Sequence, residues 1–375
     1  MKVFQLITRN ELRGAEMFAS QLSSGLALRG HQIELSSIYR PRQGQSTLPI
    51  HPSVTCACLE ATIHGKIEWA ALRTLIRRLK TLRPDVVQAN AFHALKYLSL
   101  ARRITRSRWP IIYRNISIAS RWITRPWQRA WGRWLLKPVD RVTSVSDSSA
   151  LDFCHTYRIP HRRATTIRRG IPIPDQIDRQ SARRHLAHRL SLPSHDDWQA
   201  VIHIGGFTPE KNHRGLLQAF EQIVDRHPRV HLVLCGDGPL RHEVAREIAQ
   251  HRYGHLIHQL GDQVAAADLI TGTDLLLLPS DIEGIPGVVL EASARSVPSI
   301  ATRVGGMVEC IDDGRSGLLV ERGDMMGLAS HAVTLLKHDD QRSAMGAAAR
   351  ELVELRFGMN RCLDEFEALY DEVAS

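Results

Sequence analysis

The feature that most restricts the fold of this chain is an alternation of short apolar runs with longer helical patterns. The apolar runs suit strands that are buried on both faces of a parallel sheet, and the helical patterns between them complete β–α–β units. The runs form two groups, at residues 2–7, 32–38, 85–89, 110–114 and 141–145, and at residues 200–204, 230–235, 256–260, 274–278 and 298–302. The pattern therefore predicts two doubly wound α/β domains.

A glycine and two prolines in the stretch GIPIPD, residues 170–175, predict the linker between these domains. We expect a first domain over residues 1–172, a second over 173–356 and a terminal helix over 357–375. The helix would place Leu363, Phe366 and Tyr370 on one face, and we expect it to pack back on the first domain.

The two halves of the chain carry opposite charge. Residues 1–170 contain 29 Lys and Arg against 9 Asp and Glu, whereas residues 171–375 contain 20 against 30. Such a division indicates two domains with different partners, the first of which faces an anionic molecule or surface.

Gly14 begins the helix expected after the first strand, where Phe18, Leu22 and Leu26 form a buried stripe. Free backbone N–H groups at a helix start attract phosphate, and a glycine lets a ligand approach closely. A glycine that serves only a tight turn explains the same residue equally well.

Lys211 stands between a strand that ends at Gly205–Gly206 and the next helix, in the segment HIGGFTPEKNHRGLLQAF. A lysine at this place can reach across a cleft and neutralise a diphosphate. A solvated surface lysine is the alternative.

Glu283 and Glu291 lie eight residues apart in the segment PSDIEGIPGVVLEASARSVPSIATRVGG. Pro286 suits the first turn of a helix, which would place Glu283 at the helix mouth and Glu291 about two turns inside it. A carboxylate there can accept two hydrogen bonds from a ribose diol, and the first N–H groups of the helix would point at a polar ligand. Two glutamates that only decorate the helix surface are the alternative.

These segments resemble the retaining nucleotide-sugar glycosyltransferases of glycosyltransferase family 4 over nearly the whole chain. The resemblance rests on the E-x7-E element at Glu283 and Glu291 and on the segments RGAE, RPDVVQAN, RVTSVSDSS, TTIRRGIPIP, GGFTPEKN, LVLCGDGPL and VGGMVECIDDGRSGLLV. It implies the GT-B fold, in which two Rossmann-like doubly wound parallel-sheet domains face each other across a cleft. The second domain would hold the nucleotide sugar, and the first would hold most of the acceptor.

The resemblance also implies roles for individual residues. Lys211 would bind the diphosphate, Glu291 the ribose, and Glu283 the sugar and phosphates; Glu283, Lys211 and His93 are the expected catalytic residues. The other expected donor-binding positions are Gly14, Gly206, Asn212, Gly236, Gly238, Pro239, Val264, Gly284, Ile285, Gly287 and Val288.

We expect no cofactor and no metal, because family members work without a bound metal and this sequence has no D-x-D motif. Its six cysteines also form no C-x-x-C pair.

The sequence departs from the family at two positions. Gly206 stands where many relatives carry an arginine as a second phosphate cation, and Arg214 or Arg13 is expected to compensate. Asn90 stands where relatives often carry a histidine near the reacting sugar, and His93 follows three residues later. His93 is the candidate for that polar contact; an ordinary surface histidine is the alternative, because the chain has 19 of them.

Residues 101–141 contain ten arginines and one lysine against Asp140 alone, and five of the seven tryptophans. A basic helix with an aromatic face can lie on an anionic lipid surface or bind an anionic acceptor. Tryptophans packed in the core beneath a solvated arginine face are the alternative. The expected surface residues are Arg121, Trp122, Arg125, Trp127, Arg129, Trp131, Arg133 and Trp134.

Taken together, we expect a cytoplasmic glycosyltransferase, peripheral on the inner face of the cell membrane, that acts in cell-surface polysaccharide or lipopolysaccharide synthesis. Its partners would be a nucleotide-sugar donor, a glycan or lipid-linked acceptor and an anionic membrane surface, with no nucleic acid. The alternatives are another GT-B enzyme, such as a sugar-nucleotide epimerase or a phosphorylase, and a non-enzymatic protein that binds single-stranded nucleic acid. A dinucleotide dehydrogenase is disfavoured, because no G-x-G-x-x-G follows either first strand.

Overall fold

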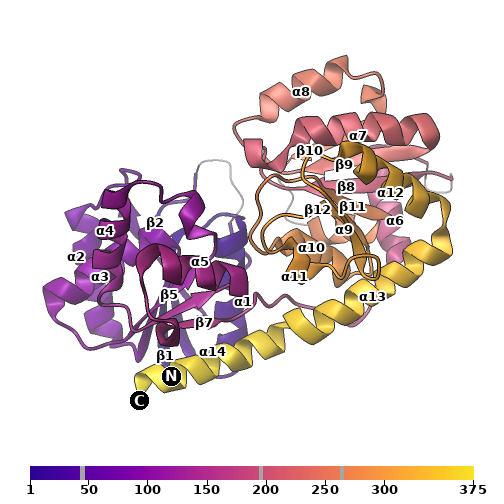
Figure 1. The fold of residues 1–375 in the computed structure, drawn as a ribbon. Coiled ribbons are helices and arrows are strands. Elements are labelled where there is room, and N and C mark those ends of the chain that lie inside the picture. Colours follow the sequence, from indigo (N-terminus) through magenta and orange to yellow (C-terminus); the bar gives the residue numbers. More distant parts are fainter. Residues whose placement is uncertain (43–46, 194–196, 262–265) are drawn as a thin grey trace. The chain divides into compact units, whose positions relative to one another are not determined.

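The computed structural model describes residues 1–42, 47–193, 197–261 and 266–375, without the side chains of 266–268. The described chain divides into two compact units, one formed by Met1–Ile171 with Met359–Ser375 and the other by Pro172–Gly358. The domain boundaries predicted from the sequence lie after residues 172 and 356. Each unit is a parallel sheet with helices packed on it (Figure 1).

The first unit, here called unit 1, contains a sheet of seven described strands in the order β3-β2-β1-β4-β5-β6-β7. Every neighbouring pair is parallel. The strands are β1 Lys2–Arg9, β2 Gln32–Tyr39, β3 Thr55–Ala61, β4 Val86–Asn90, β5 Ile111–Asn115, β6 Arg141–Ser144 and β7 Ala164–Thr166.

Helices cover both faces of this sheet because each has one apolar stripe to bury. Helices α1 (Gly14–Leu28) and α14 (Met359–Ala374) share one core with the sheet, in which Phe18, Leu363 and Phe366 are buried. On the opposite face the core takes in α2 (Trp69–Leu82), α3 (Phe92–Thr105), α4 (Pro126–Leu136) and α5 (Asp147–Tyr157). Short 3-10 turns lie at Ala119–Arg121 (η1) and His161–Arg163 (η2).

The second unit, here called unit 2, has a sheet of six described strands in the order β10-β9-β8-β11-β12-β13, again all parallel. They are β8 Gln199–Ile204, β9 Val230–Cys235, β10 Ile257–Gly261, β11 Leu275–Leu278, β12 Ser299–Thr302 and β13 Gly317–Val320. The four leucines of β11 are fully buried, as expected for a central strand covered on both faces.

Helices α7 (His213–Arg226) and α12 (Met325–Lys337) pack side by side in the main core of unit 2. Helices α6 (Arg179–Leu190), α9 (Ala266–Thr271), α10 (Gly287–Ser293) and α13 (Asp339–Phe357) pack against one another. The remaining elements are α8 Arg241–Gln250, α11 Met307–Cys310, η3 Pro209–Lys211 and η4 Gly254–Leu256.

The predicted fold class of two doubly wound parallel α/β domains is confirmed, and each of the ten predicted strands is present within two residues. Three strands were not predicted: β3, β7 and β13. All three lie at sheet edges. β3 is largely exposed and interrupted by Glu60, and β7 and β13 have only 3 and 4 residues, so each gives a weak signal in the sequence.

Asp274 joins several elements of unit 2. This buried carboxylate, at the N-terminal end of β11, accepts a hydrogen bond from the Ala200 backbone N–H at 2.8 Å. It also pairs with Arg179 and Arg183, both at 3.2 Å, and with Arg342 at 3.7 Å. One buried carboxylate thus compensates three guanidinium groups that come from two helices.

We expect Asp274→Ala to lower the free energy of unfolding of unit 2 by about 3 kcal/mol, because the partly buried guanidinium groups lose their shared counter-charge. Chemical denaturation followed by the fluorescence of Trp198, which packs under Arg183 at 3.6 Å, measures this loss. Asp197→Ala is the control: its carboxylate is 91% exposed and pairs with the exposed Arg229. That variant should lose less than about 1 kcal/mol, and equal losses in both variants would contradict the role of Asp274.

Candidate functional site

Backbone hydrogen bonds connect the loops that follow the strands of unit 2. Because the strands are parallel, these loops all emerge at the carboxyl edge of the sheet, where ligands of open α/β sheets bind. The loop after β8 bonds to the loop after β9, that loop bonds to the end of β10, and the loop after β11 bonds to the loops after β8 and β12. The bonds are Phe207 N–H to Asp237 O (3.0 Å), Gly236 N–H to Gly261 O (2.8 Å), Asp281 N–H to Glu210 O (2.8 Å) and Gly306 N–H to Gly284 O (3.0 Å).

Two glycines make this close approach possible. Gly236 has φ +141°, and a Cβ there would lie 1.9 Å from the carbonyl oxygen of Gly205. Gly305 has φ +54°, and its Cβ would lie 1.9 Å from the carbonyl oxygen of Glu283. Any side chain at either position would push two loops apart, so both positions require glycine.

Lys211 and Glu283 form an ion pair at this edge. The Nζ of Lys211 donates to the Oε1 of Glu283 at 2.5 Å, although 72 residues separate them in sequence. The Glu283 side chain is 8% exposed and that of Lys211 is 20% exposed. Asn212 holds the turn, with φ +53°, by capping α7 through Gly215 and donating to the Pro279 carbonyl oxygen at 3.3 Å.

The structure brings most of the predicted donor-binding positions to this edge, in the loops after β8, β9 and β11 and the start of α10. One expectation is wrong. Pro286 is the extended N-cap of α10 and not part of its first turn, so Glu291 lies little more than one turn inside a seven-residue helix. Val264 lies outside the described residues. The positions brought together are Gly206, Lys211, Asn212, Gly236, Gly238, Pro239, Glu283, Gly284, Ile285, Gly287, Val288 and Glu291.

Chemically, this edge of unit 2 can bind a polyanion that also carries hydroxyl groups. The Lys211 ammonium offers charge-assisted hydrogen bonds, and the amides of the glycine-rich loops offer further donors. The Glu283 carboxylate can orient the ammonium and accept hydrogen bonds from hydroxyl groups.

Two buried histidines behind Lys211 were missed in the sequence, where nothing distinguishes them from the other histidines. His203 is fully buried and its Nδ1 lies 2.9 Å from the Leu277 carbonyl oxygen. His213 stacks on Phe207 at 4.3 Å, and in the described chain neither of its ring nitrogens has a hydrogen-bond partner. Burial, with the neighbouring Lys211 and the other histidine, lowers the pKa of His203 to about 3, and burial followed by Lys211 lowers the pKa of His213 to about 4. Both rings are therefore neutral at pH 7.

Gly14 and His93 belong to unit 1 and lie at the carboxyl edge of its own sheet. Gly14 is exposed at the start of α1, and it is not among the described glycines with positive φ. A Cβ at this position would meet only Arg169 Nη1, at an ordinary 3.8 Å. The backbone therefore does not require glycine here, which contradicts the tight-turn alternative; the ligand role of Gly14 stays a prediction.

His93 is a half-buried residue in the first turn of α3. Its ring lies 5.0 Å from the ring of His64 and 6.4 Å from that of Tyr39. Burial, followed by the Lys96 and His64 charges, lowers the pKa of His93 to about 4. Ala91, the N-cap of α3 two residues before His93, has φ +83° and ψ 166°. This conformation favours glycine, so the turn that leads to His93 is strained.

Asn90, which replaces the family's histidine, is held inside unit 1. Its Nδ2 donates to Gln5 Oε1 at 3.1 Å, and its Oδ1 accepts from Gln88 Nε2 at 3.0 Å. Tyr370 of α14 donates to Gln88 Oε1 at 2.6 Å and completes this buried polar network. His93, by contrast, is partly accessible.

The aromatic residues around α4 are exposed. Trp122, Trp127, Trp131 and Trp134 have exposed fractions of 60%, 61%, 42% and 39%, which contradicts the core-packing alternative. Trp131 and Trp134 stack at 5.0 Å, and with Trp127 and Ala130 they line an apolar hollow of about 550 Å³. In the described chain, no ion pair involves Arg121, Arg125, Arg129 or Arg133.

The described helices include none that is both long and apolar enough to span a bilayer.

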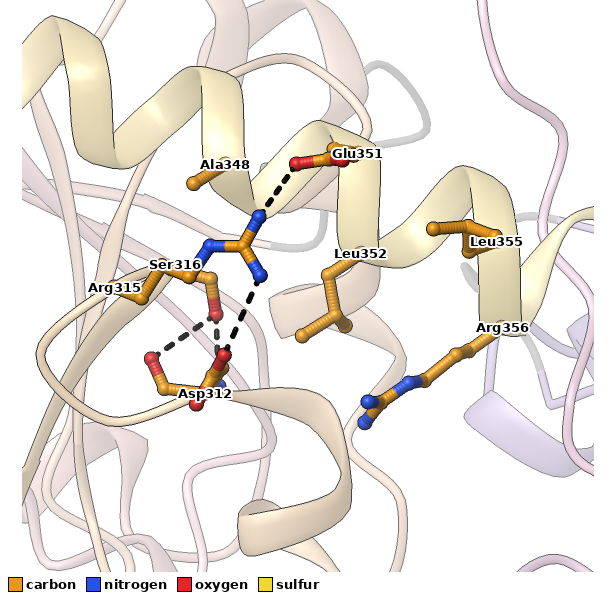
Figure 2. A pocket seen from close by; sticks show the side chains of 8 residues that line it. All are labelled: Asp312, Arg315, Ser316, Ala348, Glu351, Leu352, Leu355 and Arg356. Atoms are coloured by element: carbon orange, nitrogen blue, oxygen red, sulfur yellow. Dashed lines mark hydrogen bonds and ion pairs between the residues drawn. The ribbon is translucent and has the colours of Figure 1, made fainter.

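A separate small cavity of about 70 Å³ lies between α13 and the loop before β13 (Figure 2). Arg315 lies across it and pairs with Glu351 at 2.9 Å and with Asp312 at 3.9 Å. The cavity has room for a few water molecules and contains none of the predicted site residues, so it is not part of the candidate site.

Two family models match the chain, Glycosyltransferase Family 4 over residues 12–173 and Glycosyl transferases group 1 over residues 187–352. A curated relative is the N-acetyl-alpha-D-glucosaminyl L-malate synthase of Bacillus anthracis, which is 32% identical over 64% of this chain and 62% of its own length. The chain thus spans about three fifths of the length of this relative.

Similar solved structures cover the whole chain. HepE of Anabaena, in complex with UDP and glucose, has a TM-score of 0.82 with 19% identity over 99% of both chains. WaaG, a glycosyltransferase involved in lipopolysaccharide biosynthesis, has a TM-score of 0.75 with 16% identity over 99% of both chains. At these identities the similarity establishes the fold.

We expect the free energy of unfolding of unit 2 to fall as the pH decreases from about 6.5 to about 4. Over this range the unfolded chain protonates His203 and His213 at their ordinary pKa of 6.5, whereas the folded unit does not, so protons stabilise the unfolded state. His213→Phe keeps the stack on Phe207 and should recover about 1–2 kcal/mol at pH 5 relative to pH 7.

Denaturation at pH 5 and pH 7 measures this difference. The control is His242→Gln at an exposed position of α8, which should leave the pH dependence unchanged. An unaltered pH dependence in His213→Phe would show that His213 is not a buried neutral ring.

Proposed function

Since this chain belongs to the GT-B glycosyltransferases of the family 4 type, we propose that it transfers a sugar from a nucleoside-diphosphate sugar to a hydroxyl group of a glycan or glycolipid. We propose further that the configuration of the sugar is retained and that no metal or other cofactor takes part. The product would be a cell-surface polysaccharide or lipopolysaccharide, an assignment supported by the fold similarity to WaaG.

The observation that carries the proposal is the Lys211–Glu283 ion pair at the carboxyl edge of unit 2. A diphosphate at this edge would meet the Lys211 ammonium and the amides of the surrounding loops. Glu291 would accept hydrogen bonds from the ribose, and the loop that contains Gly236, Gly238 and Pro239 would contact the base. The complex of the similar HepE structure with UDP and glucose supports a nucleotide sugar as the donor.

In this mechanism the chain stabilises charge on the leaving group. Breakage of the bond to the anomeric carbon leaves negative charge on the diphosphate, and a fixed ammonium with fixed amides stabilises that charge better than mobile water does. Glu283 orients Lys211 and contacts the sugar. The buried histidines behind Lys211 stay neutral and so add no competing charge near the ammonium.

Unit 1 would supply the acceptor side of the reaction. His93 is neutral near pH 7 and can accept or donate a hydrogen bond at the reacting centre. Gly14 would let a polar ligand approach the start of α1.

We also propose that the Trp/Arg surface, formed by η1, α4 and the residues between them, rests on an anionic membrane. Exposed tryptophans insert at the headgroup level, and each arginine near the surface contributes about 1 kcal/mol. The four exposed tryptophans and the unpaired arginines described above support this role. The protein would then act as a peripheral protein on the cytoplasmic face of the membrane.

Calorimetry with a nucleoside diphosphate and its nucleoside tests the donor site. UDP is the first probe, followed by GDP and ADP. Lys211→Met should weaken diphosphate binding about 10- to 100-fold, because a charge-assisted hydrogen bond to the phosphates is lost. The same variant should leave binding of the nucleoside unchanged, whereas Glu291→Ala should weaken both ligands to the same extent.

The control is Lys337→Met at an exposed position in the last turn of α12, which should bind like the parent protein. Unchanged diphosphate affinity in Lys211→Met would refute the phosphate role. Conversion of the donor alone to an epimeric nucleotide sugar would instead favour an epimerase.

Co-sedimentation with phosphatidylglycerol vesicles tests the membrane surface. Reversal of Arg125, Arg129 and Arg133 to glutamate should reduce the vesicle affinity at least about a hundredfold, on the basis of about 1 kcal/mol for each arginine. The matched control reverses three exposed cations of α2: Arg73, Arg77 and Lys80. Equal losses in both triple variants would indicate a general charge effect, and unchanged pelleting of the α4 variant would refute the surface.

A further inference from the structure

A cluster of five side chains from four parts of unit 1 lies at the carboxyl edge of its sheet: Arg9, Tyr39, His64, His93 and Lys96. The Arg9 guanidinium lies 4.8 Å from the centre of the Tyr39 ring. The His64 ring stacks on Tyr39 at 5.3 Å, and His93 meets both rings. Lys96, one turn after His93 in α3, lies 5.7 Å above the Phe92 ring and lowers the pKa of His93.

The buried Tyr39 holds the loop that carries His64. Its hydroxyl donates to the carbonyl oxygen of Ile63 at 3.4 Å and accepts from the N–H of Gly65 at 3.1 Å. The backbone of both neighbours of His64 in sequence is therefore held by Tyr39, although the His64 side chain itself is exposed. An exposed imidazole that the loop holds against His93 is positioned to contact a ligand.

The charges in this cluster are unbalanced. Among the described residues, no carboxylate pairs with Arg9 or Lys96, and the charges that act on His93 come from Lys96 and His64. Glu60 is paired with Arg40 at 2.5 Å.

The second nearby carboxylate, Glu68, is also occupied. It accepts hydrogen bonds from the N–H groups of Thr62 and Ile63 and from the Thr62 hydroxyl.

Burial lowers the pKa of Lys96, which reflects the cost of holding an ammonium half-buried with no carboxylate partner among the described residues. Two cations without a carboxylate partner among the described residues, Arg9 beside Tyr39 and Lys96 near His93, favour the binding of an anion.

We propose that Arg9, His64, His93 and Lys96 form a subsite for a carboxylate or phosphate group of the acceptor. This inference rests on the proposed function and specifies its acceptor as an anionic one. Arg9 ends β1, His64 follows β3, and His93 and Lys96 follow β4, so all four come from the edge at which ligands of parallel sheets bind. An anion there gains charge-assisted hydrogen bonds and supplies the counter-charge that Arg9 and Lys96 lack among the described residues.

The experiment follows the imidazole NMR signals of His64 and His93 in the full chain with labelled histidine. The probes are inorganic phosphate and acetate, compared with chloride at equal ionic strength. Saturable shifts of both signals with phosphate, acetate or both are expected, and the probe that binds more tightly identifies the acceptor group as phosphate or carboxylate. The absence of saturable shifts with both probes would overturn the proposal.

Two variants locate the binding. Lys96→Met and Arg9→Gln should each weaken binding of the effective anion about tenfold, the loss expected for one charge-assisted hydrogen bond. Lys80→Met, an exposed lysine of α2, is the matched control and should bind like the parent protein. If Lys96→Met does not fold, His64→Gln in the exposed loop replaces it. Full affinity in the folded variants would overturn the assignment of these residues.

A separate titration with UDP, GDP and ADP distinguishes this inference from the proposed function. Nucleotide binding at Lys211 without an anion response at His64 and His93 would refute the subsite and leave the glycosyltransferase proposal intact. An anion response without nucleotide binding would refute the proposed function and, with it, the acceptor role of the subsite.

Discussion

The parallel hydrogen bonding of both sheets determines where the functional side chains meet. In a parallel sheet every strand ends at the same edge, so loops from distant parts of the chain become neighbours there. Lys211 and Glu283 form a 2.5 Å ion pair across 72 residues for this reason. Tyr39, His64 and His93 gather in unit 1 in the same way.

Electrostatic balance differs between the parts of the molecule. In unit 2 the buried carboxylates form ion pairs: Glu283 pairs with Lys211, and Asp274 pairs with three arginines. Unit 1 contains a large excess of arginine. Helix α14 offsets part of it, through Asp364 and Glu367 with Arg29 and through Glu372 with Arg141. Part of the excess that remains lies at α4 and around His93, the two places where we propose anionic partners.

Burial of neutral histidines accompanies both candidate sites. His203 and His213 behind Lys211, and His93 beside Lys96, all have lowered pKa values for the same two reasons, burial and a nearby lysine. Near pH 7 this arrangement keeps positive charge on the lysines and away from the rings. At acidic pH the same arrangement lowers the free energy of unfolding, because the unfolded chain protonates these histidines and the folded chain does not.

The fold class could be predicted from the amino-acid sequence alone, because the alternation of apolar runs and helical patterns is local. The residues expected to bind the donor remain a prediction. The ten apolar runs predicted the buried strands, and the spacing of Glu283, Glu291 and the glycine-rich turns indicated one ligand-binding edge. Three other features could be seen only in the folded chain: the strands β3, β7 and β13, the exposure of the α4 tryptophans, and the cluster around Tyr39. β3 is interrupted by polar residues and β7 and β13 are very short, so their signals in the sequence are weak. A helical Trp spacing is the same whichever side of the helix faces the core. The Tyr39 cluster draws on residues from positions 9 to 96, and their proximity follows from strand order, which no local pattern encodes.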